Sequence, residues 1–405
     1  MSDMEYVRFG ELYKIPSCNG LSRPRAVRGE GYKMVNMGEL FSNDIINDMY
    51  MERVQMNERE QKKFLLEKGD LLFARQSLVA TGAGKCSVVN NLAEKTTFES
   101  HLIRVRLDET KANPLYYYYL FQLPYNPVKT IVNQCAQAGI RGTELVRIKV
   151  PLPNIEYQNT IANALFQYDK LIENNNKRIK LLEQIAENLY KEWFVRFRFP
   201  GYEEVKFENG IPNEWEIKRL FEFGKIETGK TPSKERDQNY GEDIMFIKTP
   251  DMHDNIYVIS TNEFLSTEGH LTQPKKLLPE NSIMVSCIGT GGVVAINDKP
   301  AHTNQQINSI ILNKSEYLEW LYFVCKNLKE TIEMFGATGS TMTNLSKGKF
   351  EKLKIVSPSE KVILEYHELT KNLFIEVRVL LHKNDLLAKQ RDLLLPRLMS
   401  GKLEV

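Results

Sequence analysis

The stretch that decides the fold is Ile148–Phe199, IKVPLPNIEYQNTIANALFQYDKLIENNNKRIKLLEQIAENLYKEWFVRFRF, because a second copy of it closes the chain. The second copy begins at Leu353 and reads LKIVSPSEKVILEYHELTKNLFIEVRVLLHKNDLLAKQRDLLLPRLMSGKL. Placed with Leu353 under Ile148, the two copies align without a gap. Self-similarity of this kind indicates that one structural unit occurs twice.

Both copies carry the heptad pattern of a long amphipathic helix. Seam positions that alternate steps of four and three run from Ile161 to Trp193 in the first copy and from Tyr366 to Leu398 in the second. Such a seam lets one helix bury a face against another. The central seam residues are Tyr168, Ile172, Asn175, Ile179 and Leu182 in the first copy, and Leu380, Asn384 and Leu387 in the second.

The helix starts agree with this period. Asn154 and Ser359 each follow a proline-bounded strand end, and an acidic residue comes soon after, which is typical of an N-cap. Roughly 40 residues at about 1.5 Å each make a rod of about 60 Å, which would be half bare without a partner. We expect the two helices to pack antiparallel with their seam midpoints level. Asn175 then faces Asn384, a polar pair of the kind that fixes register.

The segments before the helices also repeat. Residues 1–150 form a first globular unit with strand-like runs at Leu71–Val89 and His101–Leu107, then a helix at NPLYYYYLFQL. Residues 200–355 repeat this order with NSIMVSCIGTGGVVAI, INSIIL and EYLEWLYFVCKNL. The helical segments are 151–199 and 356–405. The predicted fold is α/β (α+β), with two globular domains separated by a pair of long antiparallel helices and related by an internal pseudo-two-fold axis.

Composition narrows the class of protein. The chain has 405 residues, 42% of them hydrophobic and 26% charged, as in globular proteins. The longest uncharged run is too short to cross a bilayer, and the first residues lack a secretory signal. Five cysteines without a CxxC pair argue against disulfides and structural zinc, so we expect a cytoplasmic protein. A net charge of +2 means that any binding to nucleic acid must rest on local patches or on a partner.

Two strings imitate catalytic motifs. GKIETGKT at Gly224–Thr231 matches the P-loop pattern, but Pro232 removes an N–H where phosphate donors are needed, and Glu227 places a negative charge in the cradle. NPLY, at Asn113–Tyr116, has a leucine where the NPPY loop of amino-methyltransferases has its second proline, and no glycine-rich turn for a methyl donor occurs. We find no catalytic residues and no metal site.

The run of tyrosines Tyr116–Tyr119 covers every face of the helix that Pro114 begins. We expect at least one of these rings in the core and one at the surface, where a ring can stack on a base.

Two basic loops occupy matching positions of the repeated units. They are LSRPRAVRGEGYK, from Leu21 to Lys33, and TGKTPSKERDQNY, from Thr228 to Tyr240. Arginine reads guanine edges bidentately, whereas Lys, Ser and Thr hold phosphates. One basic cluster is commonly only a solvated face, but two at matching positions favour DNA binding.

The combination of these motifs, repeated in register, resembles the specificity subunit of type I restriction-modification systems over the whole chain. The marks are GKTPS at Gly229–Ser233, KGDLLFAR, ENSIMVS, the run from Lys149 into the long helix, and the closing LAKQRDLLLPRLMSGKL. The first unit departs from the pattern, because SCNGLSRP at Ser17–Pro24 replaces GKTPS.

The resemblance implies two target recognition domains that read the halves of a bipartite, asymmetric site on double-stranded DNA, with the helices as a ruler. It implies docking with two methyltransferase subunits and with restriction subunits. S-adenosylmethionine, ATP and Mg then belong to those partners, and this chain binds no cofactor and no membrane. The alternatives are a stand-alone P-loop NTPase or methyltransferase and a structural coiled-coil protein.

Two surfaces with different partners are therefore expected on this chain. The DNA-facing set is Arg23, Arg25, Arg28, Arg75, Lys85, Lys230, Thr231, Ser233, Lys248 and Lys347. The partner-facing set, on the outer strip of the helices, is Lys177, Lys180, Gln184, Lys383 and Lys389.

Overall fold

The computed structural model describes residues 5–77, 82–133, 138–337 and 343–403. The chain forms two compact units, each of which is described by itself. Unit 1 combines Met1–Leu171 with Leu387–Val405, and unit 2 is Ile172–Leu386. Both ends of the chain therefore belong to unit 1.

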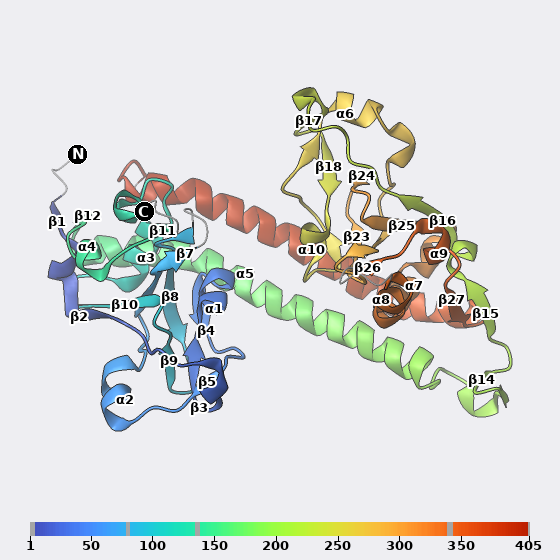
Figure 1. The fold of residues 1–405 in the computed structure, drawn as a ribbon, viewed down its shortest axis with the longest axis horizontal. Coiled ribbons are helices and arrows are strands. Elements are labelled where there is room, and N and C mark those ends of the chain that lie inside the picture. The colour runs from blue at the N-terminus through green and yellow to red at the C-terminus, as the bar shows by residue number, and fades with distance from the viewer. Residues whose placement is uncertain (1–4, 78–81, 134–137, 338–342, 404–405) are drawn as a thin grey trace. The chain divides into compact units, whose positions relative to one another are not determined.

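Unit 1 is built on a five-stranded sheet (Figure 1). The strand order is β2 (Tyr13–Asn19), β10 (Leu102–Leu107), β6 (Leu71–Ala74), β8 (Cys86–Asn91) and β4 (Ile45–Asn47). Pairing is antiparallel except between β4 and β8, which run parallel. The smaller elements are β1 (Tyr6–Arg8), β3 (Arg28–Val35), β5 (Arg53–Val54), β7 (Gln76–Ser77), β9 (Thr96–Phe98), β11 (Ala138–Gly139), β12 (Lys149–Pro151), α1 (Met37–Ser42), α2 (Glu58–Phe64), α3 (Pro114–Gln122) and α4 (Gly142–Leu145).

Unit 2 repeats this sheet strand for strand. Its order is β16 (Gly224–Thr228), β25 (Ile307–Leu312), β21 (Ile283–Ser286), β23 (Val294–Asn297) and β19 (Tyr257–Val258), again with one parallel pair, β19 and β23. The smaller elements are β13 (Phe207–Glu208), β14 (Ile211–Pro212), β15 (Glu216–Arg219), β17 (Tyr240–Gly241), β18 (Ile244–Ile247), β20 (Phe264–Leu265), β22 (Ile288–Gly289), β24 (Ala301–Thr303), β26 (Thr343–Asn344), β27 (Lys354–Ser357), α6 (Thr267–Leu271), α7 (Leu318–Asn327), α8 (Lys329–Gly336) and α9 (Lys347–Phe350). The predicted mixed fold with a duplicated globular part is confirmed.

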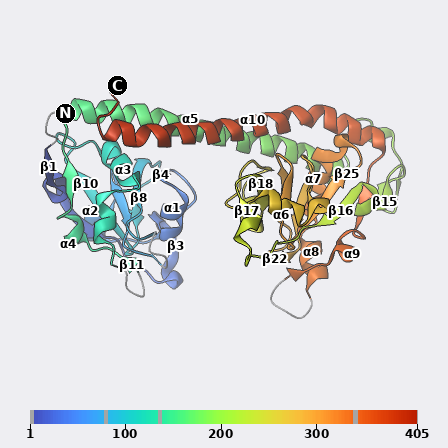
Figure 2. The ribbon, with the colours of Figure 1, turned by 90° about the horizontal axis from the view of Figure 1, so that it is seen from above.

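The tyrosines of α3 correct one prediction. All four rings, from Tyr116 to Tyr119, are buried, so the expectation of a surface ring that stacks on a base is wrong. In Figure 2, α3 lies between the sheet of unit 1 and the long helices, against which its rings pack. The Tyr117 hydroxyl donates to the carbonyl oxygen of Pro151 at 2.9 Å, and the Tyr119 hydroxyl donates to Asp169. Asn113 caps the helix, as Pro114 at its first position predicts.

The two predicted long helices are present. Helix α5 (Ile155–Tyr190) continues into a π-helical turn at Lys191–Val195, and α10 spans Glu360–Met399. The predicted cap is confirmed at α5, where Asn154 Oδ1 accepts from the backbone N–H of Tyr157 at 2.8 Å. None of the helices in the described part of the chain has the length and apolar character needed to cross a membrane.

Within each unit the two helices run antiparallel. In unit 2, Asn175 Nδ2 donates to Asn384 Oδ1 at 2.8 Å, and the rings of Trp193 and Tyr366 lie 5.9 Å apart. In unit 1, the Tyr157 hydroxyl donates to the carbonyl oxygen of Leu398 at 2.9 Å. The predicted register, with Asn175 facing Asn384, is therefore confirmed.

Replacing Asn384 by Ala should lower the free energy of unfolding of unit 2 by about 1–2 kcal/mol, because the buried Asn175 amide loses its acceptor. Urea unfolding followed by circular dichroism measures the change. The exposed Asn372 on the same helix supplies the matched control, and Asn372→Ala should change stability by less than about 0.5 kcal/mol. Equal effects of the two substitutions would contradict a register-fixing role for the pair.

Candidate nucleic-acid interface

A glycine follows the first sheet strand of each unit, at the point where the chain passes close to a neighbouring strand end. The N–H of Gly229 donates to the carbonyl oxygen of Ile307 at 3.2 Å, and a Cβ on Gly229 would lie 2.2 Å from the Asn304 carbonyl oxygen. In unit 1, the N–H of Gly20 donates to Leu102 at 3.3 Å, and a Cβ would lie 2.1 Å from the Phe98 carbonyl oxygen. Only glycine fits either place.

The two loops that follow these glycines are structural equivalents. The N–H of Lys230 donates to Thr303 at 2.9 Å, and the N–H of Leu21 donates to Phe98 at 2.8 Å. The GKTPS loop of unit 2, Gly229–Ser233, therefore has its counterpart in Gly20–Pro24 of unit 1, although the sequence there differs. Leu21, which is buried, stands where unit 2 has the exposed Lys230. The loops share a backbone path and differ in charge.

The same hydrogen bonds explain why GKIETGKT is not a phosphate-binding loop. Gly224–Thr228 is a sheet strand paired with β25, and the N–H groups of Gly229 and Lys230 already donate to carbonyl oxygens. Glu227 is buried and pairs with Lys276 and, at 3.2 Å, with Lys225, and these lysines hold its pKa below the usual value although burial raises it. A negatively charged, hydrogen-bonded strand end cannot cradle phosphates.

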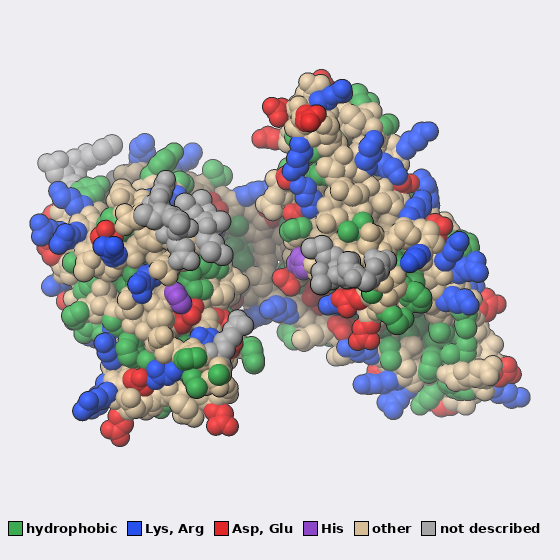
Figure 3. All heavy atoms as spheres, viewed as in Figure 1, with side chains coloured by type: hydrophobic (Ala, Val, Ile, Leu, Met, Phe, Trp, Pro, Cys, Tyr) green, Lys and Arg blue, Asp and Glu red, His purple; other side chains and the backbone are tan. Residues whose placement is uncertain are grey.

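Amides and hydroxyls crowd around the Gly229 loop in unit 2. The Thr231 hydroxyl donates to Gln305 Oε1 at 2.5 Å, and Asn304 Nδ2 donates to Gln306 Oε1 at 3.0 Å. Figure 3 shows Lys and Arg side chains over the part of unit 2 where Figure 1 places β16 and α9. These are the side-chain types that contact base edges and phosphates.

Four of the predicted DNA-facing cations are held by acids. Their pairs are Arg23 with Glu60 at 2.6 Å, Arg28 with Glu52, Lys85 with Asp44 at 3.0 Å, and Lys248 with Glu263. Each of these cations must exchange a carboxylate before it can take a phosphate. The Arg25 side chain lies outside the described residues.

The remaining predicted residues are more accessible. Lys230 and Ser233 are exposed, as is Lys347 at the start of α9, and among the described residues neither lysine forms an ion pair. In unit 1, Arg75 also lacks an ion pair to any described residue and lines a 400 Å³ pocket together with Arg141. Sequence reading missed Arg141. Its position could have indicated it. Arg141 directly precedes α4, which is equivalent to α9, and α9 begins at Lys347, a residue that the sequence predicted to face DNA.

In unit 2, the buried His302 lies against the half-buried His270. His302 Nε2 lies 3.0 Å from His270 Nδ1, and burial together with the charge of His270 lowers the pKa of His302 to about 4. His302 is therefore neutral near pH 7. Throughout the described segments, no three His, Cys, Asp or Glu side chains converge in a way that could hold a metal ion.

The predicted partner-facing residues on the helices, Lys177, Lys180, Gln184, Lys383 and Lys389, are all exposed. Lys177 pairs with Glu173 at 2.7 Å along the same helix. Sequence reading missed the exposed apolar side chains beside them. In unit 2 these include Leu181 and Ile185 on α5, and Leu364, Ile375, Val379 and Leu386 on α10. Ile375, Val379 and Leu386 lie on the side of α10 away from the seam, with Leu364 three turns before them, and these four exposed side chains are called the apolar strip.

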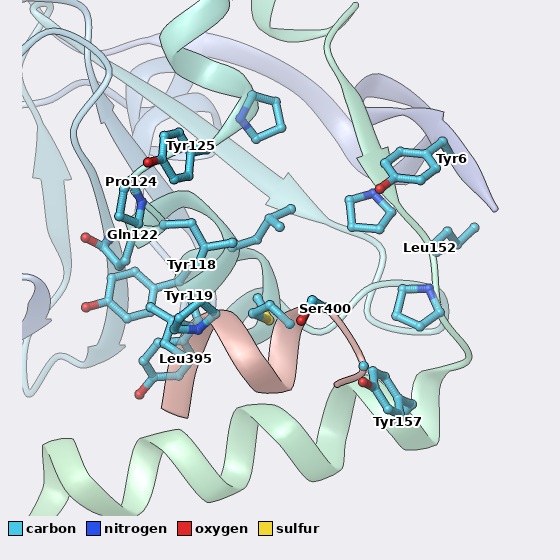
Figure 4. A pocket seen from close by; sticks show the side chains of 18 of the residues that line it. Tyr6, Tyr118, Tyr119, Gln122, Pro124, Tyr125, Leu152, Tyr157, Leu395 and Ser400 are labelled. Carbon is cyan, nitrogen blue, oxygen red and sulfur yellow. The ribbon is translucent and has the colours of Figure 1, made fainter. Parts of the chain in front are cut away.

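A groove of 1680 Å³ in unit 1 also differs from a DNA site (Figure 4). Tyr125, which is 96% exposed, lies on one side, Tyr6 lies on the other, and Leu395 and Ser400 come from the end of α10. Its other lining residues include Glu5, Asp44, Asp392 and several prolines. Arg391 of the same lining pairs with Asp392, and Asp44 pairs with Lys85, so the groove offers mainly aromatic and proline side chains rather than a basic surface for phosphates.

Replacing Gly229 by Ala should destabilise unit 2 by about 1–3 kcal/mol and displace the loop from Lys230 to Ser233, because the new methyl group collides with a backbone carbonyl. Thermal melting measures the loss. A Cβ on Gly348 in α9 would meet no atom of the described residues within 4 Å, so Gly348→Ala should leave the melting temperature unchanged or slightly raised. Tolerance of alanine at Gly229 would show that the close approach does not constrain the loop.

Comparison with known proteins agrees with these features. The family model described as type I restriction modification DNA specificity domain matches residues 1–184 and 212–366. The chain belongs to this family. The second match begins near the start of unit 2's sheet part, as the duplication of the sheets requires. Relatives in the family carry the name of specificity subunits, which is a non-catalytic DNA-recognition role.

Two curated relatives cover almost the whole of this specificity subunit. The Type I restriction enzyme HindI specificity subunit of Haemophilus influenzae is 28% identical over 96% of this chain and 99% of its own length. The putative type I restriction enzyme MjaX specificity subunit of Methanocaldococcus jannaschii is 26% identical over 96% of this chain and 91% of its own. The crystal structure of the type I restriction-modification S subunit from M. genitalium has the same fold, with a TM-score of 0.58, 13% identity, and coverage of 98% of this chain and 97% of that one.

Proposed function

We propose that this specificity subunit recognises a bipartite, asymmetric site on double-stranded DNA, and that each unit reads one half of it. The observation that carries the proposal is the duplicated sheet, in which Gly20 and Gly229 place equivalent loops at equivalent strand ends. The chemistry of the loops differs, since the buried Leu21 takes the place of the exposed Lys230. Two readers of one shape and different chemistry suit two half-sites of different sequence.

We further propose that the long helices receive two methyltransferase subunits and, through the assembled complex, restriction subunits. The exposed apolar strip on α10, from Leu364 to Leu386, supports this role, because apolar side chains exposed on one side of a helix fit a partner protein. The apolar side chains would form the dry centre of the interface with a partner, and the partner-facing lysines would lie at its polar rim. S-adenosylmethionine, ATP and Mg would be bound by those partners, and the complex would act in the cytoplasm.

Reconstitution tests the proposal directly. The chain is combined with the methyltransferase subunits of its own restriction-modification system, and methylated positions are mapped on genomic DNA. We expect methylation at a split sequence only when this chain is present. Methylation of the same positions by the methyltransferase alone would overturn the proposal.

The docking surface is tested separately. Leu386→Asp places a charge in the apolar strip, so it should prevent co-purification with the methyltransferase, whereas the exposed Lys361 on the same helix should tolerate Lys361→Asp. Co-purification of both variants at the yield of the unchanged chain would place the interface elsewhere.

A further inference from the structure

The 400 Å³ pocket of unit 1 is lined by two arginines that unit 2 lacks at the equivalent positions. Its lining residues are Ser17, Cys18, Asn19, Arg75, Ile103, Arg141, Gly142, Thr143 and Val146. It therefore sits at the end of β2, directly before the glycine loop, and is closed by the start of α4.

Backbone hydrogen bonds identify which residue of unit 2 corresponds to Arg75. The N–H of Arg75 donates to His101 at 2.8 Å, and its carbonyl oxygen accepts from Ile140 at 2.9 Å. The same two bonds in unit 2 are made by Cys287, with Gln306 at 2.7 Å and with Leu345 at 2.9 Å. Cys287 is buried, and burial raises the pKa of its thiol to about 11. A neutral thiol thus stands where unit 1 has a guanidinium.

Arg141 is matched in the same way. It precedes α4 as Ser346 precedes α9, and each is two residues beyond the strand, β11 or β26, that flanks the pocket. The carbonyl oxygen of Arg141 accepts from Leu145 at 3.0 Å, as that of Ser346 accepts from Phe350 at 2.9 Å. Both arginines of the pocket are therefore absent from the equivalent place in unit 2.

The side chains of Arg75 and Arg141 are not held by acids of the described residues. Within the described residues, Arg75 and Arg141 form no ion pair, in contrast to Arg23 and Arg28 of the same unit. Arg75 is half-buried in the wall and Arg141 is exposed. Arg75 and Arg141 both line the pocket and no lining residue is acidic, so an acceptor-rich ligand there would meet guanidinium donors without a competing carboxylate in the wall.

We propose that this pocket reads a guanine, so that the half-site recognised by unit 1 contains a G·C pair contacted by Arg75 and Arg141, whereas unit 2 makes no such contact at its equivalent position. The inference rests on the proposed function. Guanine offers two acceptors, O6 and N7, on its major-groove edge, and a guanidinium donates to both at once. Asn19 and Thr143 on the lip add the polar groups that can contact a neighbouring base or phosphate.

The test compares arginine with lysine at each position, because lysine keeps the charge and loses the paired donors. The full chain is assembled with its methyltransferase subunits and given a library of randomised duplexes, and the methylated molecules are sequenced. The unchanged complex should require one G·C pair in one half-site. Arg75→Lys and Arg141→Lys should each relax that pair by on the order of ten- to a hundredfold, with the other half-site unchanged.

Arg59→Lys is the matched control, because Arg59 is an exposed arginine on α2 of the same unit and should leave every base preference unchanged. If Arg75→Lys lowers the melting temperature, the base preference is judged from Arg141→Lys alone, because Arg141 is exposed. Unchanged preference in Arg141→Lys, or an equal loss of methylation on all sequences, would overturn the guanine assignment, since the second result indicates a phosphate contact. Absence of any split sequence in the unchanged complex would instead overturn the proposed function.

Discussion

Replacement of Asp298 by Ala should lower the free energy of unfolding of unit 2 by about 3–5 kcal/mol. Asp298 lies in the turn between β23 and β24 and is wholly buried. Its carboxylate accepts from Arg378 Nε at 2.5 Å and from His382 Nε2 at 3.0 Å, and its carbonyl oxygen accepts from Arg378 Nη2 at 2.6 Å. Without the carboxylate, a partly buried guanidinium on α10 loses its main partner.

The effect reaches beyond one ion pair, because Asp298 joins the sheet of unit 2 to α10. Arg378 and His382 are one helical turn apart on α10, so the carboxylate fixes both the position and the rotation of that face. Carboxylate-paired guanidinium groups keep their proton firmly, and the pKa of Arg378 is raised by Asp298 although burial opposes it. We therefore expect Asp298→Ala to loosen α10 against the sheet.

Urea unfolding measures the loss, and hydrogen exchange of the α10 amides around Arg378 locates it. Glu280 is the control, because it is the exposed second partner of Arg378 at 3.7 Å. Glu280→Ala should cost less than about 1 kcal/mol, as surface pairs do. A similar cost for both substitutions, with uniform exchange along α10, would show that Asp298 does not anchor the helix.

The helix register could be predicted from sequence because a heptad seam is a local, periodic signal. Once the two copies align without a gap, the pairing of Asn175 with Asn384 follows from geometry alone, and the structure has it. The duplication of the sheets was predictable for the same reason. Element order and apolar runs repeat in the chain itself.

The burial of the tyrosines and the ion pairs could not be predicted in this way, because both depend on residues distant in sequence. Tyr119 is buried because α5 and α10 pack over it, and the residue pattern of α3 alone gives no information about that packing. Glu60 and Glu52 pair with Arg23 and Arg28 of the first basic loop, yet nothing in the sequence of that loop marks these acids as its neighbours. A basic cluster in a sequence therefore predicts how many Lys and Arg side chains lie close together. The fold determines how many of them are left without a carboxylate partner.

The equivalence of Gly20 and Gly229 was hidden for a related reason. The sequence motif is recognised by the residues Lys, Thr, Pro and Ser that follow Gly229. The structural equivalence instead rests on the glycine itself, because a Cβ at either glycine would lie about 2 Å from a backbone carbonyl oxygen. Leu21 and Lys230 share a backbone position and nothing else. The side chain after the glycine can therefore differ between the units, whereas the glycine itself cannot be replaced without a collision.

In unit 1, Asp169→Ala should cost about 3–5 kcal/mol, because one carboxylate on α5 joins three elements. The Tyr119 hydroxyl of α3 donates to one oxygen of Asp169, and Arg391 of α10 donates to the other. Asp169 is buried, and Arg391 is mostly so, with its pKa raised by the acid beside it. Tyr119→Phe removes only the neutral donor and should cost about 1 kcal/mol. Urea unfolding of the two variants measures the difference.

Unit 2 indicates how the loss can be recovered. In the gapless alignment of the two copies, Phe374 stands at the place of Asp169 and Ala186 at the place of Arg391. Phe374 packs against Tyr322 and Phe323, with ring centroids 5.8 Å and 6.0 Å apart, so the same junction is apolar there. Replacing a buried ion pair by apolar groups of suitable size is often neutral. Asp169→Phe combined with Arg391→Ala should therefore be more stable than Asp169→Ala alone. If the double variant unfolds at the same urea concentration as Asp169→Ala or lower, the junctions of the two units are not interchangeable, and the carboxylate itself is required in unit 1.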